Sequence, residues 1–215
     1  MKLNFKVSVI SIDDFYLPSD EMKLAIKNNP WNVSRGFPGS HSVKLMHEKL
    51  LNWKINGELN VPVFDKSLRN GLGDRSHWRL DNPDILIIEG WFLGIEPLSR
   101  DVNYQYLNLA ELTSHESSYI NKIQNNLEKY LDVWSLIDNI WHLKPLKIEY
   151  MNMWKTNQEK EMFLQKGNAL QDKKLSNFLR MLNVSIPHES FDSIKSYALL
   201  LIDQERNLIE SGLNL

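Results

Sequence analysis

Two short apolar runs in this chain each end in a carboxylate. Residues Lys6 to Ile12 are rich in β-branched side chains and lead into Asp13 and Asp14, and the run Asp84 to Ile88 leads into Glu89. Such runs predict strands buried on both faces of a parallel sheet. The carboxyl ends of these strands form the ligand-binding edge of an α/β sheet. We therefore expect the three acids to lie at one such edge.

Acids at this edge suit phosphoryl transfer. That reaction needs one carboxylate to orient an acceptor hydroxyl and accept its proton, and another near the magnesium that bridges the phosphates. Asp13 or Asp14 suits the first role and Glu89 the second. An alternative stays open at this point, because acids after strands also act as helix N-caps or solvated turn residues.

The remaining segments predict a chain of alternating strands and helices. Apolar residues after Ser42 recur at helical spacing, whereas Phe64 to His77 has two glycines among many charged residues and is interpreted as a loop. Further elements are expected as follows: a helix from about Leu107 to Asp138, a strand within Asn139 to Leu146, a helix from Glu149 to Gln165, and a final strand within Ser196 to Ile209. Because no repeat or linker divides the chain, we expect a single domain spanning residues 1–215.

Bulk composition excludes several classes of protein. The 215 residues are 42% hydrophobic and 24% charged, as in ordinary globular proteins. A net charge of −2 gives no general attraction to nucleic acid or anionic lipid. No apolar run approaches the roughly 18–20 residues of a membrane span, and the N-terminus does not resemble a signal peptide. With no cysteine present, we expect a cytoplasmic protein that binds a small-molecule substrate, without nucleic-acid or membrane partners and of undetermined oligomeric state.

Five segments in order carry a family resemblance. They read SIDDFYLP (Ser11 to Pro18), RGFPGSH (Arg35 to His41), PVFDKS (Pro62 to Ser67), GDRSHW (Gly73 to Trp78) and EGWFLG (Glu89 to Gly94). Each is weak alone, but together they resemble the D-glycerate 3-kinase-like branch of the phosphoribulokinase, uridine kinase and pantothenate kinase superfamily. The clear resemblance covers roughly residues 7–97. It implies an α/β, P-loop NTPase-like fold with a mainly parallel sheet flanked by helices. It also implies transfer of the ATP γ-phosphoryl group, with Mg²⁺, to a hydroxyl of a small acid, D-glycerate being favoured.

The resemblance also implies roles for single residues. Asp13 takes the place of the general base, Tyr16 lines the acceptor pocket next to Asp14, and Glu89 is associated with magnesium and its waters. Lys66 and Arg75 are expected to contact an anionic acceptor or the transferred phosphoryl group, since a guanidinium grips such anions bidentately. The remaining candidates for binding the acceptor are Arg35, His41 and Asp65. The candidate for binding the nucleotide is Lys155, which lies in a segment where relatives carry cationic lid residues.

Structural alternatives to these roles remain. Lys66 and Arg75 could belong to an ordinary solvated loop face, and His41 could cap the helix that begins near Ser42.

The phosphate-binding motif G-x-x-x-x-G-K-[ST] is absent from the sequence. Gly71-Leu72-Gly73 has no following G-K-[ST], and Gly36 to Gly39 contains Pro38, which lacks an amide donor. The family places a strand, the phosphate loop and a helix before the strand that ends at Asp13, with that strand in the middle of the sheet. We therefore expect a fold without this unit, whose neighbouring strands lack backbone partners and expose an apolar face.

Two other functions stay open. One is a catalytically inactive remnant or truncated form with no ATP turnover. The other is a kinase with a nucleoside or pantothenate-like acceptor, against which the cations Arg35, Lys66 and Arg75 argue because they suit an anion.

Overall fold

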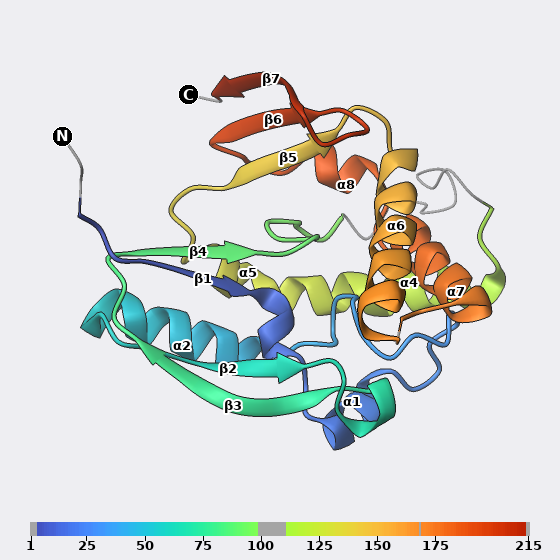
Figure 1. Ribbon diagram of the computed structural model, residues 1–215, viewed down its shortest axis with the longest axis horizontal. Helices are drawn as coiled ribbons and strands as arrows, with labels where there is room; N and C mark the ends of the chain where they lie inside the picture. The colour runs from blue at the N-terminus through green and yellow to red at the C-terminus, as the bar shows by residue number, and fades with distance from the viewer. Residues whose placement is uncertain (1–3, 99–110, 168, 214–215) are drawn as a thin grey trace.

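The computed structural model describes residues 4–98, 111–167 and 169–213, which form an α/β fold of three small sheets with helices around them (Figure 1). The strands are β1 (Val7–Ser11), β2 (Leu59–Asp65), β3 (Asp74–Asp81), β4 (Ile85–Glu89), β5 (Trp141–Pro145), β6 (Ala198–Ile202) and β7 (Leu208–Leu213). The α-helices are α1 (Ser19–Ala25), α2 (Val43–Asn56), α4 (Ser114–Leu127), α5 (Leu131–Trp134), α6 (Glu149–Lys166), α7 (Asp172–Val184) and α8 (Glu189–Asp192). Short 3-10 helices span Ile12–Phe15, Arg69–Gly71 and Glu128–Tyr130. Within these ranges no helix has both the length and the apolar composition of a membrane span.

The two strands predicted to end in acids pair with each other. β1 and β4 run parallel, and their register pairs Ser11 with Glu89 (Figure 1). Just beyond, Gly90 lies against Ile12, and a Cβ atom at position 90 would come within 2.4 Å of the Ile12 Cδ1 atom. Only glycine therefore fits where the chain leaves β4.

The prediction that these strands are buried on both faces is wrong. In β1, Ser8 and Ile10 are buried, whereas Val7 is 49% and Val9 54% exposed. Because Val7 pairs with Ile85 and Val9 with Ile87, the exposed side chains of both strands share one face. No described element covers that face, which confirms the expectation of an exposed apolar surface.

The parallel strands form two separate sheets. β5 pairs with β6 in parallel, and β6 pairs with β7 antiparallel. Within the described residues, β4 pairs only with β1 and β5 only with β6, so one edge of each strand has no ladder partner. The α/β class with parallel strands and flanking helices is confirmed, and the split between the two sheets lies beside β4, the strand that ends at Glu89.

The interpretation of Phe64 to His77 as a loop is wrong at both ends. Phe64 and Asp65 belong to β2 and Asp74 to His77 to β3, and the two strands form an antiparallel hairpin. Most β3 side chains are exposed, and an antiparallel ladder can present one face to water. The high charge of the segment therefore did not exclude strand structure.

Two further predictions need correction. The helix predicted over residues 107–138 is confirmed from Ser114 to Trp134, with a 3-10 turn between α4 and α5. Thr113 caps the start of α4. Residues 107–110 lie outside the described residues. The strand predicted in the apolar run at the start of Ser196 to Ile209 is confirmed as β6, but it is not the final strand, because a turn and β7 follow it. Asp203 holds this turn, since both its carboxylate oxygens accept hydrogen bonds from Asn207.

A buried carboxylate joins three parts of the core. Glu116 on α4 accepts hydrogen bonds from Trp31 Nε1 at 2.9 Å and from the Arg180 guanidinium of α7 at 2.7–2.8 Å. These contacts come from residues 85 positions before and 64 positions after Glu116. The Arg180 hydrogen bonds are the main reason that the pKa of Glu116 is lowered from 4.5 to about 2.

Replacing Glu116 by glutamine should lower the free energy of unfolding by about 1–3 kcal/mol at neutral pH, because Arg180 then lacks a charged partner. A carboxyl with a depressed folded pKa stabilises the fold above its unfolded pKa, and this contribution disappears as the pH falls from 4.5 toward 2. Urea unfolding of wild type and Glu116→Gln at pH 7 and pH 3 should therefore show a smaller difference at pH 3. The exposed Glu161→Gln serves as control, and an undiminished difference at pH 3 would contradict the assignment.

Candidate active site

The structure distinguishes the two adjacent acids after β1. Asp14 accepts hydrogen bonds from the backbone N–H groups of Ser11 at 3.2 Å and Phe64 at 3.4 Å, so it joins β1 to β2. The Asp13 carboxylate instead accepts a hydrogen bond from Lys66 Nζ at 2.7 Å. Asp13 therefore contacts a charged side chain, whereas Asp14 holds the local backbone.

A buried histidine lies behind Asp13. His41 Nε2 lies 3.9 Å from Asp13 Oδ1, and His41 Nδ1 lies 2.9 Å from the Tyr130 hydroxyl oxygen. That oxygen also accepts a hydrogen bond from the Gly39 N–H. The Tyr130 hydrogen is thus free to be donated to Nδ1, which favours the neutral tautomer with its proton on Nε2, facing Asp13. Burial lowers the pKa of His41, consistent with a neutral ring.

Tyr16 completes this buried group. Its ring stacks on His41 at 4.5 Å between centroids and meets Phe64 edge-on at 5.1 Å. A backbone bridge between Tyr16 and His41 holds the two residues together. Burial, followed by the nearby charge of Asp13, raises the pKa of Tyr16 well above its ordinary value.

Asp13 is ionised despite its partial burial. Burial alone would raise its pKa, but the interactions with His41 and with the Lys66 ammonium outweigh that effect and hold the pKa well below 3.8. A carboxylate fixed in this form can accept a hydrogen bond from an acceptor hydroxyl and orient it. Lys66 remains largely exposed, so a bound anion can reach its ammonium group.

Two candidate arginines lie close to this group. The Arg35 guanidinium donates to the carbonyl oxygens of Gly71 and Leu72 and lies 5.8 Å from the Phe64 ring centroid. Burial lowers the pKa of Arg35, although the nearby charge of Asp13 counteracts this effect. Arg75 donates to Ser42 Oγ at 2.7 Å, so it lies at the start of α2, next to His41, and not against Asp13.

The other predicted residues take different positions. Asp65 accepts hydrogen bonds from the backbone and hydroxyl of Ser67 and so shapes the turn that contains Lys66. Lys155 on α6 forms an ion pair with Glu159 at 2.5 Å and lies 4.9 Å from the Phe178 ring centroid. His41 is fully buried, which places it behind Asp13 and not on an open pocket wall.

A metal site is only partly formed by the described residues. Glu89 is exposed at the end of β4, opposite Ser11 in the ladder. No group of three or more acidic or histidine side chains in the described ranges could hold a metal alone. Magnesium commonly keeps several waters and takes one or two carboxylates together with substrate phosphates. Glu89 fits that limited role.

Tyr130 is the functional candidate that sequence reasoning missed. It lies 89 positions from His41, and in the sequence it is one more apolar residue at helical spacing.

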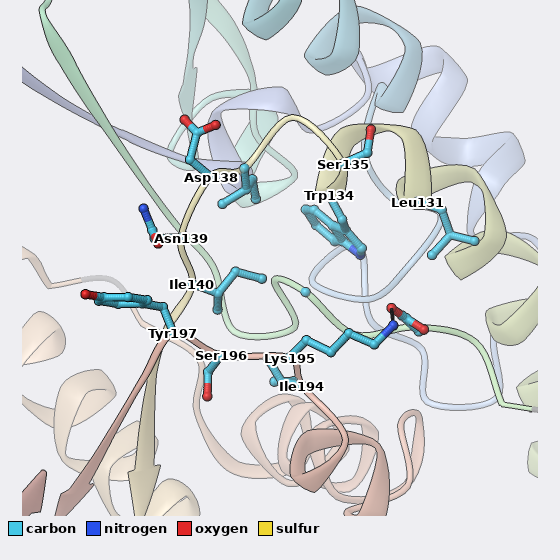
Figure 2. Close-up of a pocket in the computed structure, with 13 residues that line it drawn as sticks. Leu131, Trp134, Ser135, Asp138, Asn139, Ile140, Ile194, Lys195, Ser196 and Tyr197 are labelled. Carbon is cyan, nitrogen blue, oxygen red and sulfur yellow. Dashed lines mark hydrogen bonds and ion pairs between the residues drawn. The ribbon is translucent and has the colours of Figure 1, made fainter. Parts of the chain in front are cut away.

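A separate cavity of about 750 Å³ lies away from these groups, between α5 and the segments that enter β5 and β6 (Figure 2). None of the predicted site residues lines it.

Similar proteins decide the family. The chain is 31% identical over 226 residues to the probable ATP-dependent kinase TDA10 of Saccharomyces cerevisiae, covering 94% of this chain and 75% of that protein. It is 32% identical to the chloroplastic D-glycerate 3-kinase of Arabidopsis thaliana, over 81% of this chain and 39% of that protein. The solved structure of D-glycerate 3-kinase from Cryptococcus neoformans superposes with a TM-score of 0.81 at 25% identity, over 97% of this chain and 80% of that chain. No family model matches the sequence.

The chain belongs to the D-glycerate 3-kinase-like branch of the P-loop kinases. The resemblance drawn from five short segments is therefore confirmed. All five segments lie in or next to the elements described above: the turn after β1, the segment before α2, the β2–β3 hairpin and the end of β4.

In this glycerate kinase-like protein, Lys66→Met should raise the pKa of Asp13 toward its ordinary value of 3.8, because the methionine removes the nearby positive charge. A titration of the Asp13 carboxyl carbon by ¹³C NMR measures this directly. Lys173→Met on the exposed side of α7 is the control and should leave that pKa unchanged. An equal Asp13 titration curve in Lys66→Met and wild type would show that the ion pair is not formed in solution.

Proposed function

We propose that this chain has the acceptor site of an ATP-dependent, glycerate kinase-like phosphotransferase that phosphorylates a hydroxyl group of a small organic acid, with D-glycerate favoured. The observation that best supports this proposal is the ionised Asp13 carboxylate, which pairs with the exposed Lys66 ammonium and lies 3.9 Å from the buried, neutral His41 ring. In this arrangement Asp13 orients the hydroxyl and takes its proton, and Lys66 attracts the negative charge of the acceptor or the transferred group.

An anionic acceptor agrees with the charges around Asp13. The Lys66 ammonium lowers the pKa of Asp13. The charge of Asp13 in turn acts to raise the pKa of Arg35, so both cations lie near this carboxylate. A neutral nucleoside would bring no negative charge to these cations. A carboxylate can pair with them in addition to the contacts that they make within the chain. The names of the Arabidopsis and Cryptococcus relatives supply D-glycerate as the specific candidate.

We propose ATP as the phosphoryl donor because of the relatives, and Mg²⁺ because of the position of Glu89. The yeast relative is described as ATP-dependent. Glu89 would hold magnesium together with waters and phosphate oxygens. We propose a small molecule as the substrate class, without nucleic-acid or membrane partners. A cysteine-free chain also fits the proposed cytoplasmic location.

A second candidate is a relative without ATP turnover. It is supported by the absence of G-x-x-x-x-G-K-[ST] from the sequence, since that loop supplies the amides and the lysine that cradle the phosphates. The two candidate functions, an active kinase and a relative without ATP turnover, differ in one observable property. Only the active kinase would phosphorylate the acceptor once a phosphate-binding segment is present.

Asp13→Asn tests the role of Asp13 in a version of the chain extended by a segment with the G-x-x-x-x-G-K-[ST] motif. We expect phosphorylation of D-glycerate to fall by about 100- to 10,000-fold, because the amide cannot accept the hydroxyl proton. ³¹P NMR of ATP, Mg²⁺ and D-glycerate measures the product. Asp20→Asn, an exposed acid on α1, is the matched control.

Near-normal turnover by Asp13→Asn would remove Asp13 from the role of base. If the extended wild-type chain shows no turnover with D-glycerate, the candidate without activity is favoured instead.

A further inference from the structure

A buried tyrosine reaches the Asp13 carboxylate through His41. Tyr130 lies in the 3-10 turn after α4, and its hydroxyl oxygen lies 2.9 Å from His41 Nδ1. The other ring nitrogen of His41, Nε2, lies 3.9 Å from Asp13 Oδ1. Tyr130 and His41 are both buried, so water does not compete for the contact between them. The Tyr130 hydroxyl therefore acts on the nitrogen that faces Asp13 from the opposite side of the ring.

The hydrogen bonds of the Tyr130 hydroxyl have a fixed direction. Its oxygen accepts a hydrogen bond from the Gly39 N–H at 3.1 Å. Gly39 has a φ of 102°, and the Asn126 side chain of α4 lies so close to it that no Cβ atom fits, which holds this N–H in place. The hydroxyl hydrogen is then donated to the remaining partner, Nδ1. The proton of the neutral His41 ring consequently lies on Nε2, towards Asp13.

Aromatic packing holds the His41 ring in this orientation. Tyr16 stacks on it at 4.5 Å between centroids, Phe92 lies at 5.6 Å, and the Tyr130 ring meets it edge-on at 6.0 Å. Nε2 has no hydrogen-bond partner within the part of the chain that the structure describes, and 3.9 Å is longer than a hydrogen bond. The Nε2–H group therefore acts on Asp13 as an oriented dipole with its positive end towards the carboxylate.

The two partners of Asp13 differ in their access to a bound molecule. The Lys66 side chain is 57% exposed, whereas that of His41 is fully buried. An anion that enters the site can draw the Lys66 ammonium away from Asp13, but it does not reach His41. Burial raises the pKa of Asp13, and among the interactions that lower this pKa the one with His41 comes first, ahead of Lys66. His41 is thus the partner that Asp13 keeps when an anion binds.

We propose that Tyr130 is a positioning residue, whose hydroxyl holds His41 in the Nε2–H tautomer so that Asp13 stays ionised and in place while Lys66 pairs with a substrate anion. With the proton on Nδ1 instead, the Nε2 lone pair would face the carboxylate and repel it. The use of this carboxylate as a base rests on the proposed function, whereas the tautomer and its effect on Asp13 do not.

The other groups that act on Asp13 do so without the Tyr130 hydroxyl. They come from the segment after β1, from the segment before α2 and from the β2–β3 turn, and they are Tyr16, Arg35 and Lys66. A change confined to the Tyr130 hydroxyl therefore acts on the carboxylate through His41.

Long-range ¹H–¹⁵N correlation spectra of the histidine rings measure the tautomer in the wild-type chain. The signals that are absent from His41→Gln assign the His41 ring. We expect a protonated Nε2 and an unprotonated Nδ1, and a ring that stays neutral below pH 6.5, because burial lowers the pKa of His41. A proton on Nδ1 with a bare Nε2 would overturn the proposal, and this result needs no variant of Tyr130.

A matched pair of tyrosine variants tests the effect on Asp13. Tyr130→Phe removes the hydroxyl that contacts His41, and Tyr119→Phe removes another buried hydroxyl, which has no hydrogen-bond partner among the described residues. Tyr130→Phe should give signals of both His41 tautomers and raise the pKa of Asp13, measured by ¹³C NMR of its carboxyl carbon. Tyr119→Phe should change neither.

Lys66→Met imitates the withdrawal of Lys66 by an anion. In this background, Tyr130→Phe should raise the pKa of Asp13 further and above its ordinary value of 3.8, because burial then outweighs the interactions that remain. Lys66→Met with Tyr119→Phe should titrate as Lys66→Met does alone. Equal titration curves of the two double variants would contradict the proposed role.

A role of Tyr130 in packing alone predicts a different result. Tyr130→Phe would then lower the melting temperature but leave the His41 tautomer and the Asp13 titration unchanged, which would overturn the proposal. Equal shifts of Asp13 in Tyr130→Phe and Tyr119→Phe would overturn it as well. Neither nucleotide nor acceptor is present in these experiments, so a failure of the proposed kinase activity is distinguishable from a failure of this inference.

Discussion

The parallel pairing of β1 with β4 determines where the candidate catalytic carboxylates lie. Its register places Ser11 opposite Glu89, so Asp13 and Glu89 leave the sheet at one edge. The contact between Ile12 and Gly90 keeps the segments that follow β1 and β4 close together, because no side chain fits at position 90. The other side chains of the candidate site lie around Asp13, in the segment after β1. A shift of one residue in this register would turn the buried side chains of β1 to the opposite face.

A second constraint is the cost of keeping Asp13 ionised while it is partly buried. Desolvation disfavours the charge, and the structure offsets it with Lys66 on the β2–β3 turn and with the His41 ring. His41 is in turn oriented by Tyr130 from the 3-10 turn after α4. Lys66 and His41 thus act on the carboxylate directly, and Tyr130 acts on it through His41. A hydrogen-bonded network of this kind holds its members in one arrangement, which is what an acceptor site requires.

The sequence predicted where β1 and β4 lie and that acids follow them at one edge of the sheet, because apolar runs and the residues that end them are local properties. It also predicted the exposed apolar face, from the family resemblance together with the absence of the G-x-x-x-x-G-K-[ST] motif from the sequence. It could not separate Asp13 from Asp14, since their difference depends on the distant partners Lys66 and Phe64. Tyr130 was missed for the same reason. The β2–β3 hairpin was missed because the charged residues and the two glycines of Phe64 to His77 are typical of a loop, although Leu59, Val61 and Val63 alternate on β2.

Calorimetric titration of this chain, with D-glycerate and with ATP–Mg²⁺ in separate experiments, tests the central claim that it holds an acceptor site without a complete nucleotide site. The account predicts saturable binding of D-glycerate that is lost in Lys66→Met, and no saturable binding of ATP–Mg²⁺. Micromolar binding of ATP–Mg²⁺ would contradict it by revealing a phosphate site within these residues. A folded chain that does not bind D-glycerate would contradict the assignment of the acceptor site.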